Sequence, residues 1–121
     1  PLGHDFCAIN LSDNLKPWNL IERRLRLAAE ADFAMALYNP RSRSRPEGFA
    51  RALDTLREAH RADPPVIFAR AVSTPDETIS TVPLSRATPE MADMRTVVIV
   101  GNSQTRTIPG TNWTYSPRSA P

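Results

Sequence analysis

Short apolar runs alternate with amphipathic segments along this chain. Most of the apolar runs span only a few residues, which is a length typical of strands, and turn-forming residues end them. The run at residues 78–82 alternates apolar and polar positions instead, which favours a strand with one exposed face. We expect strands at residues 6–11, 33–37, 66–69, 78–82 and 96–100.

Two longer segments carry apolar residues at helical spacing. Pro17 suits the first position of one helix and Pro46 that of a second, because a missing N–H costs nothing there. On the outer face of the first helix, Glu22 and Arg26 are spaced to pair. The inner faces are expected to comprise Ile21, Leu25, Ala28 and Ala29 in the first helix, and Phe49, Leu53, Leu56 and either Ala59 or His60 in the second.

Together these elements predict an α/β domain with a mixed β-sheet flanked by helices. Residues 78–82 should pair antiparallel beside residues 66–69, while residues 83–94 read as irregular or weakly helical. The uninterrupted β-branched run at 96–100 predicts a central strand covered on both faces. We place the domain at residues 1–108, followed by a polar, mobile tail at residues 109–121.

Charge and composition exclude several classes of protein. A net charge of +2 gives no sign of a nucleic-acid-binding protein, and no apolar run is long enough to span a membrane. A single cysteine, Cys7, allows no disulfide within the chain and favours the reducing cytoplasm. The start at Pro1, without Met and beside a strand-like segment, suggests a segment of a longer protein.

Common catalytic and metal-binding patterns are missing. Four scattered glycines form no phosphate loop, no G-x-S-x-G elbow occurs, and the acidic residues suggest no catalytic carboxylate pair. His4, His60 and Cys7 have no spacing that completes a ligand set, so we expect no metal site.

Polar residues follow four of the predicted strands. If these strands point the same way, their loops line one edge of the sheet, where open α/β sheets bind ligands. Arginine accounts for 14 of the 15 basic residues, and guanidinium groups hold carboxylates well. Each loop alone is an ordinary turn, so the residues themselves define only an α/β domain with an anion-friendly edge. The loops are Ser12-Asp13, Tyr38-Asn39-Pro40, Arg70-Ala71-Val72 and Gly101-Asn102-Ser103.

The same segments resemble a known family. PLGHDF at residues 1–6, INLSD at 9–13, LYNPRS at 37–42 and VIVGNSQTR at 98–106 are similar to the precorrin-3B C17-methyltransferases, a branch of the tetrapyrrole methylases. The likeness covers nearly the whole chain. Lys16, Asn10 and the segment at 114–118 depart from the family pattern, and the glycine-rich N-terminal domain of the family is not in this sequence.

This resemblance implies the C-terminal domain of an enzyme that transfers a methyl group from S-adenosyl-methionine to carbon 17 of precorrin-3B. The missing N-terminal domain would complete the cleft, and a homodimer is expected. The residues expected to contact the cofactor are Leu37, Tyr38, Ala71, Val72 and Thr105, and those expected to bind the tetrapyrrole substrate are Ser12, Asp13, Asn39, Arg41 and Arg70.

Two alternatives remain open. The chain could be a non-catalytic module for dimerisation or for binding an anionic ligand, or a methylase of the same superfamily with another substrate. The neighbouring arginines Arg43 and Arg45 fit a solvated loop as well as a binding site.

Overall fold

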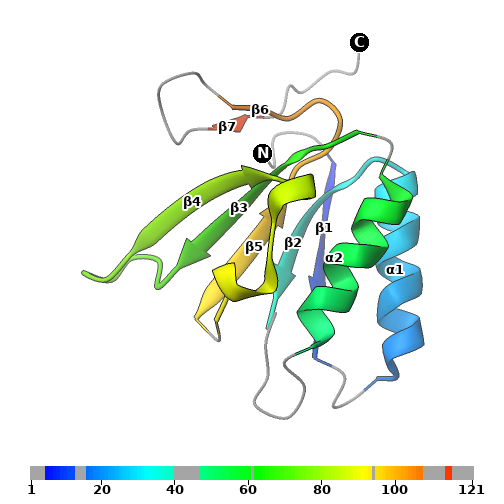
Figure 1. Cartoon of the computed structure of the whole chain (residues 1–121), viewed down its shortest axis with the longest axis horizontal. Coiled ribbons are helices and arrows are strands. Elements are labelled where there is room, and N and C mark those ends of the chain that lie inside the picture. The colour runs from blue at the N-terminus through cyan, green and yellow to red at the C-terminus, as the bar shows by residue number, and fades with distance from the viewer. Residues whose placement is uncertain are drawn as a thin grey trace.

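The computed structural model describes residues 5–12, 16–39, 47–60, 62–93, 95–107 and 114–115. It contains a five-stranded mixed sheet with two α-helices packed on one face (Figure 1), which confirms the predicted α/β architecture. The elements are β1 (Phe6–Asn10), α1 (Trp18–Glu30), β2 (Ala34–Tyr38), α2 (Gly48–Ala59), β3 (Pro65–Arg70), β4 (Thr78–Pro83), the 3₁₀ turns η1 (Leu84–Arg86) and η2 (Pro89–Met91), β5 (Thr96–Val100), β6 (Arg106–Thr107) and β7 (Thr114–Tyr115).

The order of the strands fixes which loops meet. The sheet runs β1-β2-β5-β3-β4, with β1 parallel to β2 and β5 antiparallel to both of its neighbours. The strands β1, β2 and β3 therefore point the same way, and β4 and β5 point the opposite way. We call the edge at the carboxyl ends of β1, β2 and β3 the carboxyl rim, and the other edge the amino rim.

Both helices begin close to the predicted positions. Pro17 has an extended backbone and precedes α1, so the helix starts one residue later than predicted, at Trp18. Pro46 lies outside the described residues, and α2 starts at Gly48. His60 ends α2 with an extended backbone. The buried residues of α1 are the four predicted from the helical spacing.

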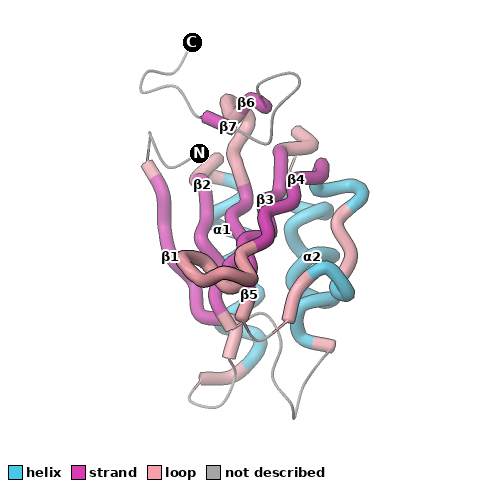
Figure 2. The backbone as a smooth tube through the Cα atoms, turned by 90° about the vertical axis from the view of Figure 1, so that its left-hand side faces the viewer, coloured by secondary structure: helices cyan, strands magenta, loops and turns pink. Residues whose placement is uncertain are grey.

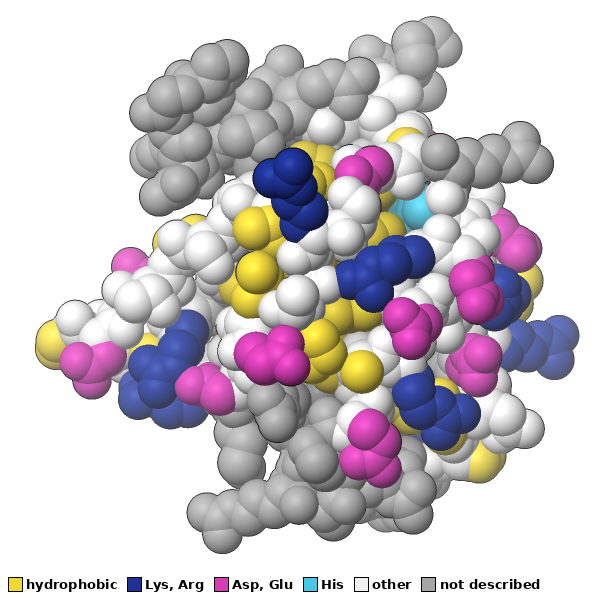
Figure 3. All heavy atoms as spheres, viewed as in Figure 1, with side chains coloured by type: hydrophobic (Ala, Val, Ile, Leu, Met, Phe, Trp, Pro, Cys, Tyr) yellow, Lys and Arg dark blue, Asp and Glu magenta, His cyan; other side chains and the backbone are white. Residues whose placement is uncertain are grey.

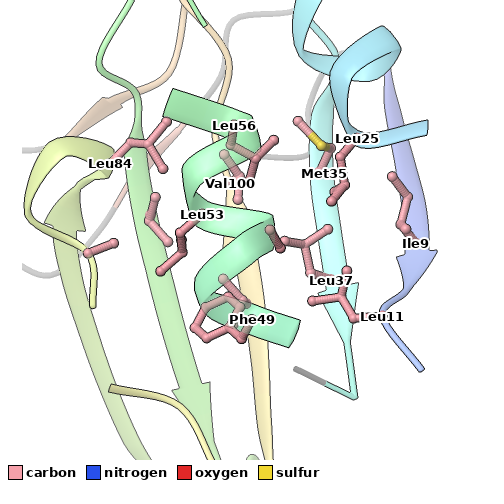
Figure 4. Packing of buried hydrophobic residues seen from close by; sticks show 14 of the residues in the cluster. Ile9, Leu11, Leu25, Met35, Leu37, Phe49, Leu53, Leu56, Leu84 and Val100 are labelled. Carbon is pink, nitrogen blue, oxygen red and sulfur yellow. The ribbon is translucent and has the colours of Figure 1, made fainter. Parts of the chain in front are cut away.

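The helices bury their apolar faces against the sheet to form the core. Phe49, Leu53 and Leu56 of α2 all point toward the strands (Figure 4), and all three side chains are completely buried. The Phe49 ring meets Phe68 of β3 edge to face, with 6.1 Å between ring centroids. Such aromatic pairs add stability beyond that of area burial.

The opposite face of the sheet carries no helix among the described residues (Figure 2). The strand β5 is central, as predicted, but the prediction that both of its faces are covered is wrong for the described residues. Phe6, Tyr38, Ile79 and Val97 point to this side by register and are all exposed, Val97 at 39%. A β-branched run indicates that neither face of the strand carries charge. It does not indicate which segment, if any, packs on each face. Charged groups are spread instead over the helix-bearing side (Figure 3).

The predicted tail at residues 109–121 lies almost entirely outside the described residues. Its two described residues form β7, which pairs antiparallel with β6. The boundary at residue 108 stays a prediction. No helix in the described ranges combines the length and the apolar character that crossing a membrane requires.

Candidate functional site

The first part of the carboxyl rim is a small amide cluster between β1 and β2. The side-chain oxygen of Asn10 accepts hydrogen bonds from the Ser12 backbone N–H at 2.9 Å and from Asn39 Nδ2 at 3.0 Å. Asn39 has a left-handed backbone with φ of 54°, a conformation that asparagine tolerates better than most residues. Ser12 and Asn39, both predicted as substrate residues, therefore lie together at the rim.

Leu37 and Tyr38 end β2 on opposite faces of the sheet. Leu37 is completely buried in the core beneath the helices, whereas Tyr38 is exposed on the helix-free face. The Tyr38 carbonyl oxygen accepts the Leu11 N–H at 3.0 Å, which extends the β1–β2 pairing to the rim. Leu37 thus packs in the core beneath the carboxyl rim, and the Tyr38 side chain lies at the rim on the helix-free face.

The loop after β3 has a strained but well-bonded backbone. Ala71 and Ser73 have φ values of 53° and 66°. The Ala71 N–H donates to the Arg95 carbonyl, and the Ala71 carbonyl accepts from both the N–H and the hydroxyl of Thr74. Positive φ at a residue other than glycine costs of order 1 kcal/mol or more and is concentrated at functional sites.

Val72 is the exposed member of this loop. Its side chain is 52% exposed, although Ala71 beside it is buried. Among the described residues, no hydrogen bond engages the N–H or the carbonyl of Val72. Within the described ranges, the rim therefore presents an apolar side chain together with an unpaired backbone donor and acceptor, a combination that is common in small-molecule sites.

Arg70, the last residue of β3, is paired at the same rim. Its Nε donates to the Oδ2 of Asp93, a residue of the loop before β5. The Arg70 guanidinium lowers the pKa of the Asp93 carboxyl to about 2, so this carboxylate is ionised throughout the physiological range. Asp93 raises the pKa of Arg70 in return, chiefly through the same hydrogen bond.

The fourth predicted strand end does not join the other three. Because β5 is antiparallel to β2 and β3, Gly101, Asn102 and Ser103 lie at the amino rim, and the expectation of one shared edge is wrong for them. Thr105, predicted to contact the cofactor, lies with them. It is buried, and its hydroxyl accepts the Asn102 N–H at 2.9 Å. The cofactor role of Thr105 stays a prediction.

The amino-rim loop instead ties β5 to the end of α1. Ser103 donates its backbone N–H to Asp32 Oδ1 at 2.9 Å and its hydroxyl to Asp32 Oδ2. A Cβ at Gly101 would lie 2.7 Å from the Thr105 side chain, so glycine is required there by close packing. This segment fixes the geometry of the fold at the amino rim.

Asp13 and Arg41, two of the predicted substrate residues, lie outside the described residues. Asp93, by contrast, was missed from the sequence although it contacts Arg70. A signal existed in the Asp-x-x-Thr spacing of Asp93 and Thr96, which is typical of side chains that cap a turn. In the described ranges, no three His, Cys, Asp or Glu side chains are grouped closely enough to hold a metal ion.

A cavity of about 420 Å³ lies at the amino rim between the ends of the two helices, and Glu30, Asp32, His60 and Ser103 help to line it. The Nε2 atom of His60 is buried without a hydrogen-bond partner among the described residues. Burial lowers the pKa of His60, and the negative charge of Asp32 offsets part of this effect. The folded protein therefore favours neutral His60.

Stability should consequently fall as the pH drops through the ordinary histidine range. The unfolded chain binds a proton at His60 near pH 6.5, whereas the folded chain binds it only at lower pH. Urea unfolding at about pH 7.5 and about pH 5.5 should show a lower unfolding free energy at the acidic value. His60→Gln should reduce this difference, and an undiminished difference in this variant would refute the assignment.

Comparisons with known proteins support the family resemblance. The chain is 57% identical over 108 residues to a precorrin-3B C(17)-methyltransferase of Sinorhizobium sp, which covers 89% of this chain and 42% of that protein. A probable cobalt-factor III C(17)-methyltransferase of Salmonella typhimurium is 45% identical over 87% of this chain and 44% of its own length. No protein-family model matches the chain.

Solved structures agree with these relatives. The crystal structure of the methyltransferase CobJ superposes with a TM-score of 0.91 and 62% sequence identity, covering 97% of this chain and 48% of CobJ. A cobalt precorrin-4 methyltransferase shares the fold at a TM-score of 0.54 with only 13% identity, covering 79% of this chain and 39% of that protein.

The fold is thus that of a domain from the methyltransferases of cobalamin biosynthesis. Within that class, the chain matches roughly the C-terminal half of the precorrin-3B C17-methyltransferases. The chain spans less than half the length of the Sinorhizobium, Salmonella and CobJ proteins, and it matches roughly the C-terminal half.

Proposed function

We propose that this chain is the C-terminal half of an S-adenosyl-methionine-dependent enzyme that methylates carbon 17 of precorrin-3B during ring contraction in corrin biosynthesis. The observation that carries the proposal is the likeness to the Sinorhizobium precorrin-3B C(17)-methyltransferase, at 57% identity over 89% of the chain. Because the chain covers only part of its relatives, the activity is proposed for the full-length enzyme. By this we mean the present segment joined to the other half, either in its parent protein or in a chimera with the Sinorhizobium relative.

The residues at the carboxyl rim fit half of a cofactor site. The exposed Val72 side chain can cover one face of an adenine ring, and its unpaired N–H and carbonyl can hydrogen-bond to the ring edge or the ribose. The bonded turn at Ala71 holds Val72 in place at the carboxyl rim, where Tyr38 lies on the other side of β5. S-adenosyl-methionine would supply an electrophilic methyl group on a sulfonium.

Methyl transfer requires alignment and exclusion of water more than it requires a strong acid or base. The described rim suits that requirement, since it offers a rigid backbone, one exposed apolar side chain and polar groups that can orient a second ligand. Asn39 and Ser12 can donate hydrogen bonds to the acetate and propionate arms of a tetrapyrrole. Arg70 adds a guanidinium, which binds carboxylates strongly.

The activity is tested directly with the full-length enzyme. Incubated with S-adenosyl-methionine and precorrin-3B, it should yield a product that carries one additional methyl group, detected by mass spectrometry with isotopically labelled methyl donor. A product without the labelled methyl would refute the proposal. Because the Salmonella relative is named for cobalt-factor III, the cobalt-containing substrate is the second candidate and should be assayed in parallel.

Arg70→Ala should weaken substrate binding selectively. Loss of a charged hydrogen bond costs about 1.5–3 kcal/mol, so the dissociation constant for the tetrapyrrole should rise about ten- to a hundredfold. The affinity for S-adenosyl-methionine, measured by calorimetry, should barely change, and Arg41→Ala should act in the same direction. Equal losses for both ligands would show that these arginines support the cofactor or the fold instead.

We also propose a cytoplasmic homodimer for the full-length enzyme. The cytoplasmic assignment rests on the single cysteine, Cys7, and on the family resemblance. The uncharged, helix-free face of the sheet supports self-association, because contiguous exposed apolar surface marks contact sites. Light scattering should give twice the chain mass. Val97→Glu should shift the protein toward the monomer, while Leu27→Glu, at a more exposed apolar position on α1, should not.

A further inference from the structure

The Arg70–Asp93 pair differs from an ordinary surface ion pair because the carboxylate itself is fixed. Asp93 Oδ1 accepts the Arg95 N–H at 2.8 Å and the Thr96 hydroxyl at 2.9 Å. The Asp93 N–H in turn donates to the Thr96 hydroxyl oxygen at 3.0 Å, and Thr96 is buried. The oxygen Oδ2 remains for the Nε of Arg70. The turn before β5 therefore fixes where the guanidinium can lie.

The pairing uses only one edge of the guanidinium. Arg70 has three nitrogens that can donate, and Asp93 takes Nε alone. Among the described residues, neither Nη nitrogen of Arg70 has a hydrogen-bond partner, and the side chain is 40% exposed. The two Nη nitrogens can hold a carboxylate with two parallel hydrogen bonds.

On the basis of the proposed function, we infer that Asp93 is a positioning residue, which holds the Arg70 guanidinium with its Nη edge free to receive a carboxylate arm of the tetrapyrrole. Ordering a long arginine side chain before the ligand arrives removes a cost of binding. The position of Asp93 follows from the topology, because the amino end of the antiparallel β5 meets the carboxyl end of β3.

Positioning and plain electrostatics predict opposite signs, which makes the inference testable. Asp93→Asn removes a negative charge beside an anionic ligand, so the loss of Coulomb repulsion alone would tighten tetrapyrrole binding. The Asn Oδ1 can keep both hydrogen bonds of the turn, but its amide would direct a donor toward Arg70 Nε and release the arginine. We expect the tetrapyrrole dissociation constant of the full-length enzyme to rise about three- to tenfold, the equivalent of ordering one long side chain.

A matched control and a double mutant complete the test. Asp63 also caps a turn, through the backbone N–H and hydroxyl of Ser85, but at the amino rim, so Asp63→Asn should leave tetrapyrrole binding unchanged. In an Arg70→Ala background, Asp93→Asn should cause no further loss of tetrapyrrole binding. The Asp93→Asn single variant should bind S-adenosyl-methionine as tightly as the unaltered enzyme does.

Each other outcome is decisive. Unchanged or tighter tetrapyrrole binding in Asp93→Asn, while Arg70→Ala binds weakly, overturns the positioning role and leaves the proposed function intact. An equal loss from Asp93→Asn with and without Arg70 also overturns it, because the effect would then arise from the fold. If the unaltered full-length enzyme binds no tetrapyrrole, or Arg70→Ala binds it normally, the proposed substrate site itself fails.

Discussion

The 121-residue chain on its own is expected to transfer no methyl group. It covers less than half of the Sinorhizobium and CobJ relatives, so the other half of the proposed cleft, with its share of ligand contacts and its exclusion of water, is absent from the chain. S-adenosyl-methionine should bind no more tightly than roughly millimolar, about −4 kcal/mol, as measured by calorimetry.

The control for this experiment is a test of whether the purified 121-residue chain is folded. A cooperative unfolding transition in urea would show that the absence of turnover does not arise from an unfolded sample. The full-length enzyme, assayed beside it, should turn over. Measurable methyl transfer by the purified chain would refute the assignment of this segment as half of an enzyme.

Phe49→Ala should destabilise the domain by roughly 3–5 kcal/mol, the usual cost of removing a buried phenylalanine. The side chain is completely buried between α2 and the sheet and loses its edge-to-face contact with Phe68. Since domains are typically stable by about 5–15 kcal/mol, this loss is a large share of the total. Urea unfolding followed by circular dichroism measures it.

Phe6→Ala is the matched control, because Phe6 lies in the same sheet but is 52% exposed on the helix-free face. Its effect on the unfolding free energy of the isolated chain should be within about 0.5 kcal/mol. A similar loss in both variants would mean that the two faces are equally buried in solution, contrary to the described arrangement.

The elements of this fold could be predicted because their causes are local. Helical spacing identified the buried residues of α1, and the β-branched run located β5. The direction of β5 could not be predicted, since nothing within residues 96–100 distinguishes a parallel from an antiparallel neighbour. Because of that unknown direction, the Gly101-Asn102-Ser103 loop was expected at the wrong rim.

The candidate site was predictable to the same degree. Ser12, Asn39, Arg70 and Val72 follow strands that point the same way, so the general rule for α/β sheets was enough to group them. Asp93 was missed because it precedes its strand, and only an antiparallel strand brings its amino end to the carboxyl rim. Pairing between distant segments decides such contacts, and a single sequence does not display it.

The position of β5 also sets the order in which this domain can form. It is the last strand of the sheet in the sequence, yet it separates β2 from β3. Until residues 96–100 have left the ribosome, β2 and β3 each lack a neighbour and present an open edge, which is a template for pairing with other chains. Nearly the whole segment must therefore be synthesised before its sheet can close, and folding should be slow for a domain of this size.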